Sequence, residues 1–66
     1  MASSRRLKIR EELEGIHKNC DWLQAHCIKA VNIIGPDNPL VAKGFTSLAA
    51  LAQTLDDFAS DIYSTI

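Results

Sequence analysis

Two histidines and two cysteines lie close together in the chain, and these residue types could ligate zinc or carry nucleophilic chemistry. His17, Cys20, His26 and Cys27 fall within 11 residues of the sequence. On a helix, residues three, four or seven apart share a face, which puts both cysteines on one face and the histidines on opposite flanks. One hairpin of helices cannot bring all four side chains to a tetrahedral zinc ion. We therefore expect no metal site and no cofactor.

A histidine beside carboxylates is the second candidate for chemistry. Asp21 follows His17 at the i+4 position, and a helical hairpin would bring Asp56 against the same imidazole. Such an imidazole can be a general base, a metal ligand or a phosphate contact, or can form only a surface hydrogen bond and ion pair. A subunit interface could still recruit His17 and Asp21 to a metal. Because no nucleophile, base and orienting group can be assembled together, we expect a protein that is not an enzyme.

The elements that must position these residues are two helices with a 3.5-residue apolar repeat. Alternate steps of four and three residues, taken from Ile9 and again from Val41, meet an apolar residue at every stop. This repeat is typical of helices that pack knobs into holes. The two seams consist of Ile9, Leu13, Ile16, Cys20, Leu23, Cys27, Ala30 and Ile34, and of Val41, Phe45, Leu48, Ala52, Leu55, Ala59, Ile62 and Ile66.

The segment between the seams has the composition of a tight turn. Gly35 suits the left-handed position after a helix, Asn38 is a good N-cap, and Pro39 fits the first position of a new helix. Folding about this turn pairs seam residues whose numbers sum to 75, and five of the eight pairs set a small residue against a large one, as close-packed layers require. We predict one all-α domain over residues 1–66, an antiparallel two-helix hairpin. Its helices span about 4–34 and 39–65, joined by a turn at 35–38.

A hairpin of 66 residues is too short to form a self-sufficient core. Trp22, Ile33, Leu51 and Phe58 flank the seam and would stay in water in a monomer. Exposed apolar patches of this size mark interfaces, and such hairpins commonly pair. We expect a homodimer or higher oligomer, a four-helix or larger bundle, with these four residues contacting another copy or another protein.

Cysteine placement and hydropathy predict the setting of the protein. Cys20 and Cys27 lie seven residues apart on one helix, too far to bond to each other, and both belong to the seam. We interpret them as reduced core residues, which favours the cytoplasm. Neither a membrane-spanning run nor a signal-peptide pattern is present, so no membrane partner is expected.

Charge is nearly balanced, with a net charge of −1, and this gives no overall nucleic-acid footprint. Basic residues gather at the start of the first helix and acidic ones near the end of the second, so the hairpin brings both groups to one end. Basic and aromatic side chains could nevertheless hold an anionic nucleotide between subunits. The candidate contacts are Arg5, Arg6, Arg10, His17, His26 and Tyr63.

The segment Leu55-Asp56-Asp57-Phe58-Ala59-Ser60-Asp61-Ile62-Tyr63 is similar to the second helix of Rop, a plasmid RNA-binding family. The resemblance implies a dimeric four-helix bundle that binds RNA through the faces of its first helix. Here those faces also carry Glu11, Glu12, Glu14 and Asp21, which makes RNA a less expected partner. Size and architecture also resemble small helical oligomers of phages that sequester cyclic oligonucleotide signals, which implies a phage or plasmid accessory role.

The leading hypothesis is a non-catalytic, oligomeric helical bundle that acts by binding, as a small regulator or inhibitor of another protein. It rests on the apolar residues that one hairpin cannot bury. The alternatives are sequestration of an anionic nucleotide signal between subunits and Rop-like binding of RNA.

Overall fold

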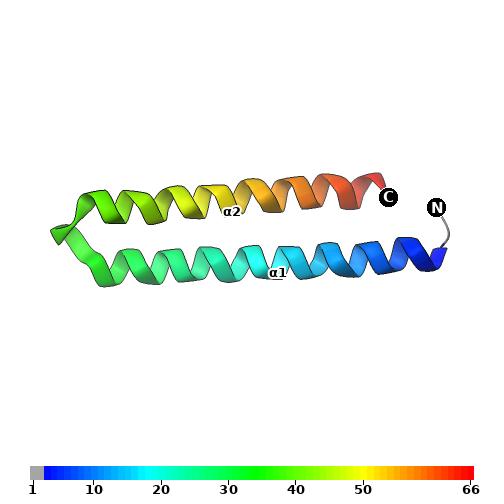
Figure 1. Ribbon diagram of the computed structural model, residues 1–66, viewed down its shortest axis with the longest axis horizontal. Coiled ribbons are helices and arrows are strands. Elements are labelled where there is room, and N and C mark those ends of the chain that lie inside the picture. Colours follow the sequence, from blue (N-terminus) through cyan, green and yellow to red (C-terminus); the bar gives the residue numbers. More distant parts are fainter. Residues whose placement is uncertain (1–2) are drawn as a thin grey trace.

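The computed structural model describes residues 3–66, and almost all of this range is helical. Helix α1 spans Ser3–Ile34, a single 3-10 turn, η1, spans Gly35–Asp37, and α2 spans Pro39–Thr65 (Figure 1). The predicted helix bounds differ from these by at most one residue. The prediction of an all-α, two-helix hairpin is confirmed, while residues 1 and 2 of the predicted domain lie outside the described range.

The turn has the backbone chemistry that its sequence predicts. Gly35 has a φ of 62°, in the left-handed region that glycine enters without a steric penalty. The side chain of Asn38 caps α2, accepting a hydrogen bond of 3.4 Å from the backbone N–H of Val41. Pro39 follows at the first position of α2, where its missing N–H leaves no hydrogen bond unmade. These local features reverse the chain within a few residues, so the two helices run antiparallel.

The hairpin is one layer of two helices that lie side by side, with the start of α1 and the end of α2 at the same end of the molecule (Figure 1). Its Cα atoms extend over 54 × 15 × 10 Å. Within residues 3–66, neither helix has an apolar stretch long enough to cross a bilayer. Within the described residues, α1 and α2 have only each other as a neighbouring helix, so most of the surface of each faces outward.

The core is a single line of contact between α1 and α2, occupied mainly by small side chains. The buried residues are Leu13, Cys20, Cys27, Ala52 and Ala59. Cys20 and Ala52, each only 2% exposed, are the most enclosed of these. Small side chains at these positions let the helix backbones approach closely, which is how so thin a molecule excludes water from its middle.

The repeat predicts that all sixteen seam residues hold one hairpin together, and this prediction is wrong because the seam is only about half buried. In each of the five central pairs, from Leu13 with Ile62 to Cys27 with Leu48, one partner is buried and the other is 43–54% exposed. The buried residues of each helix share one of the two alternating seam positions, so the line of contact in this hairpin follows that position. Their exposed partners occupy the other position, where the described part of the hairpin leaves about half of each side chain uncovered.

Candidate functional site

The side of the hairpin on which the large seam residues are exposed is the first candidate site, and we call it the apolar face. Its members share one position of the heptad on each helix and are Ile16, Leu23, Val41, Leu48, Leu55 and Ile62. Single exposed apolar side chains are ordinary on protein surfaces, whereas a contiguous set of this size marks an interface. Repetition along both helices suits packing against further helices.

The four flanking residues predicted at an interface are all exposed. Leu51 and Phe58 lie one step further around α2 and continue the apolar face. Trp22, 63% exposed, lies further around α1, with its ring centre 6.2 Å from that of His26. Ile33 lies near the turn and is the most exposed of the four. The hairpin alone thus leaves each of them free to contact a partner.

The other side of the hairpin is a polar flank, the second candidate site. Its members are Arg10, His17 and Gln24 of α1 and Gln53, Asp56 and Tyr63 of α2. Gln24 Nε2 donates a hydrogen bond of 3.1 Å to Gln53 Oε1, and the guanidinium carbon of Arg10 lies 5.2 Å from the centre of the Tyr63 ring. Because these pairs join the two helices on one side, the apolar face lies on the opposite side.

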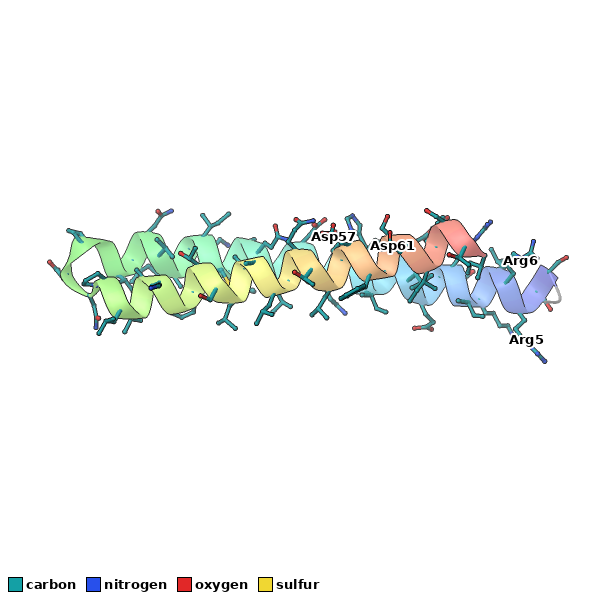
Figure 2. The ribbon with its side chains drawn as sticks, turned by 90° about the horizontal axis from the view of Figure 1, so that it is seen from above. Arg5, Arg6, Asp57 and Asp61 are labelled. Atoms are coloured by element: carbon teal, nitrogen blue, oxygen red, sulfur yellow. The ribbon has the colours of Figure 1, made fainter. Side chains whose placement is uncertain are left out.

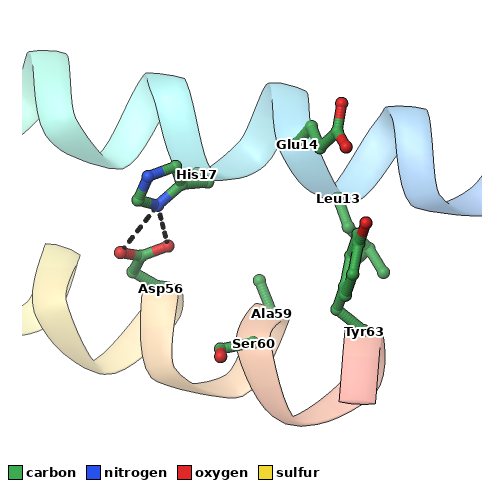
Figure 3. A pocket seen from close by; sticks show the side chains of 7 residues that line it. All are labelled: Leu13, Glu14, His17, Asp56, Ala59, Ser60 and Tyr63. Carbon is green, nitrogen blue, oxygen red and sulfur yellow. Dashed lines mark hydrogen bonds and ion pairs between the residues drawn. The ribbon is translucent and has the colours of Figure 1, made fainter. Parts of the chain in front are cut away.

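His17 is the most tightly held side chain of the polar flank. Its Nδ1 lies 2.7 and 2.9 Å from the two carboxylate oxygens of Asp56 (Figure 3). A carboxylate only accepts, so the imidazole Nδ1–H is the donor. On the opposite edge of the ring, Nε2 lies 3.4 Å from Asp21 Oδ2. The predicted placement of the imidazole between two carboxylates is confirmed.

A cavity of about 210 Å³ adjoins this pair. It is lined by Leu13, Glu14, His17, Asp56, Ala59, Ser60 and Tyr63 (Figure 3). The sequence predicts the pair of His17 and Asp56 but not Ser60 as a neighbour of it, although Ser60 follows Asp56 by one helical turn. Two of its lining residues, Glu14 and Asp56, carry carboxyls, so the cavity suits a cation better than an anion.

The six residues predicted to contact an anionic ligand do not come together on one hairpin. Arg5 and Arg6 lie on the first turns of α1, beyond the last turn of α2 (Figure 2). Within the described residues, no ion pair joins either arginine to Asp57 or Asp61. His26 lies beside Trp22, away from the polar flank. The remaining three, Arg10, His17 and Tyr63, share the polar flank.

The pKa of His17 is raised above its ordinary value of 6.5, first by the hydrogen bond with Asp56 and then by the negative charges of Asp21 and Asp56. The folded state therefore binds the imidazole proton more tightly than the unfolded chain does. This interaction stabilises the fold fully below about pH 6.5 and is lost as the pH rises through the higher folded-state value.

We predict that thermal stability falls between pH 5.5 and pH 8.5 and that His17→Gln removes this part of the pH dependence. The reason is that glutamine takes up no proton on folding. Thermal unfolding at fixed protein concentration, followed by circular dichroism, measures the melting temperature at each pH. His26→Gln is the matched control, and its melting temperature should fall with pH as steeply as that of the wild type. If the melting temperatures of the wild type and His17→Gln fell equally with pH, the pH dependence could not be assigned to His17.

Cys20 and Cys27 are free thiols, and both are buried in the line of contact between the helices. Burial raises the pKa of the Cys20 thiol, with smaller contributions from the charges of Asp56 and Asp21. A thiol with a raised pKa is a poor nucleophile and a poor metal ligand at neutral pH. Cys20 therefore acts in this hairpin as a small core residue.

Comparison of the chain with protein-family models, with curated protein sequences and with solved structures gives no significant match. The two-helix hairpin is consistent with a Rop-like architecture, and the likeness extends no further than this layout of helices.

Proposed function

We propose that this protein is a non-catalytic helical bundle that acts by binding, formed when two hairpins pack through their apolar faces. We further propose that the bundle serves as a small regulator or inhibitor of another protein. The observation that carries both statements is the set of large seam residues that the hairpin leaves half exposed, from Ile16 to Ile62.

The dimensions of the face support a second copy as its occupant. A hairpin 54 Å long and 15 Å wide presents a face of roughly 800 Å², which is about what each partner contributes to a standard stable interface. If two such faces met, the large residues of both hairpins would lie together in the middle, between the two lines of small buried residues. This layout completes the core that 66 residues cannot supply in one copy.

The same surface supports a foreign partner, because it can accept any amphipathic helix of similar length. In helix-in-groove recognition, the target helix contributes apolar side chains three, four or seven residues apart. The apolar residues of α1 and α2 have the same spacing. Trp22 and Phe58 flank the face, and exposed aromatic residues of this kind commonly dominate binding energy at protein interfaces. A target helix could thus replace one copy of the hairpin or bind at the edge of the pair.

Native mass spectrometry of the protein, purified gently from its own host, tests this function. We expect a species of twice 7.3 kDa together with a complex that contains a second protein. A Phe58→Ala variant purified in the same way should lose the second protein while its helical content stays unchanged. A strictly monomeric chain with no bound protein would overturn the proposal.

A further inference from the structure

Three potential metal ligands, His17, Asp21 and Asp56, meet on the polar flank, with one ligand atom of each within 4.8 Å of the others. They come from both helices, so the fold and not local sequence alone brings them together. The site is separate from the apolar face, which lies on the opposite side of the hairpin. What it binds is therefore independent of the function proposed above.

The hydrogen bond with Asp56 prepares the imidazole of His17 for a metal. Asp56 is the least exposed of the three, with 17% of its side chain accessible, and it holds Nδ1–H of His17 through both oxygens. In the neutral ring this places the lone pair on Nε2, the edge that faces Asp21. Histidines that bind zinc in proteins commonly donate their other N–H to a carboxylate in this way, which fixes the tautomer and the ring orientation.

The separation of the two remaining atoms suits one ion between them. His17 Nε2 lies 3.4 Å from Asp21 Oδ2. Two ligand atoms bound to tetrahedral zinc at about 2.0–2.1 Å are about 3.3–3.4 Å apart, so this pair already has the required spacing. The i, i+4 relation of the two residues on α1 keeps that spacing, because both side chains project from the same face of one helix.

The charge around the site also favours a cation. Glu14 lines the adjoining cavity, so a third carboxylate lies close to the site. The carboxylates in direct contact with the imidazole are those of Asp21 and Asp56. Arg10 is engaged with the ring of Tyr63 at the far end of the cavity.

We propose that His17 Nε2 and the carboxylate of Asp21 chelate a divalent transition-metal cation of the zinc type, with Asp56 as the positioning residue. Water completes the coordination sphere, so the ion keeps open positions that a carboxylate or phosphate of another molecule can occupy. This replaces the expectation from the sequence that the chain has no metal site. The four-residue set of histidines and cysteines considered there is not involved, because both cysteines are buried in the line of contact between the helices and neither joins the cluster around His17.

Titration of the full chain with ZnCl₂ at pH 7.5, followed by the ring signals of its two histidines in NMR spectra, tests the proposal. We expect saturable changes at His17 below millimolar zinc and none at His26. His17→Gln and Asp21→Asn should each weaken binding measured by calorimetry at least about 10-fold, and Asp56→Asn should weaken it about 10- to 100-fold while retaining the His17 response.

His26→Gln and Asp57→Asn are the matched controls, and both should bind zinc as the wild type does. Substitution of Co²⁺ for zinc adds a second readout, because ligation by Cys20 or Cys27 would give a thiolate-to-cobalt charge-transfer band, and we expect none. Equal responses at both histidines, unchanged affinity in Asp21→Asn, a thiolate band, or no response at 1 mM zinc (about the weakest affinity of interest) would each overturn the proposal.

Discussion

Leu55→Glu is expected to abolish self-association at micromolar concentration. Leu55 lies in the middle of the apolar face and is 54% exposed in the single hairpin, so a partner copy would cover what is left of it. In a two-fold symmetric dimer the substitution introduces two carboxylates into one interface. A buried charge without a partner costs about 3–5 kcal/mol, so the dissociation constant should rise at least about 100-fold. Analytical ultracentrifugation across a dilution series measures the change.

Ile28→Glu is the matched control for this prediction. Ile28 is also a large aliphatic residue of a helix, with 61% of its surface exposed, but it lies away from the apolar face, near Val31 and Ala49. Glutamate at this position remains in water, so self-association should persist with nearly the wild-type affinity. The assignment of the interface fails if both variants dissociate equally or if Leu55→Glu associates as the wild type does.

Ala52→Leu is expected to destabilise the protein strongly, although leucine is apolar and a good helix former. Ala52 is 2% exposed in the line of contact between α1 and α2, so three further carbon atoms would overpack it. Overpacking of this kind costs about 1–3 kcal/mol. For a chain of this size each kcal/mol lowers the melting temperature by about 4–8 °C. Thermal unfolding at fixed concentration measures the loss.

Ala50→Leu, two residues away on the same helix, is the control. Ala50 is exposed, so the same change of side chain meets no neighbour and alters helix propensity very little. Its melting temperature should stay close to that of the wild type. A similar loss in both variants would mean that the line of contact does not pass through Ala52.

The hairpin and its register follow from the sequence because their causes are local or periodic. Gly35 and Asn38 determine where the chain turns, and the 3.5-residue repeat determines which faces meet. Once the register is known, the pairing of His17 with Asp56 follows from counting residues outward from the turn. The structure has each of these features where the sequence predicts them.

The half-burial of the seam could not be read from the repeat. A heptad pattern is the same for helices that form a pair and for helices that form a larger bundle, because it records which residues avoid water and not how many helices cover them. Cys20 and Leu23 look equivalent in sequence, yet one is buried and the other is half exposed. The difference depends on side-chain volume and on the axis of closest approach, which are properties of the assembled hairpin.

The chemistry of the polar flank was only partly accessible for a related reason. Sequence spacing brings His17, Asp21 and Asp56 together, but it gives neither the nitrogen that each carboxylate faces nor the distance between them. The Nδ1 contact with Asp56 and the spacing of 3.4 Å between Nε2 and Asp21 depend on side-chain rotamers, which the sequence does not specify.

Sedimentation equilibrium of the wild-type chain over a range of micromolar concentrations tests directly whether another copy of the chain covers the apolar face. We predict a mass of twice 7.3 kDa, or a higher multiple, that falls toward the monomer value only on dilution. A mass of 7.3 kDa at every concentration would contradict it.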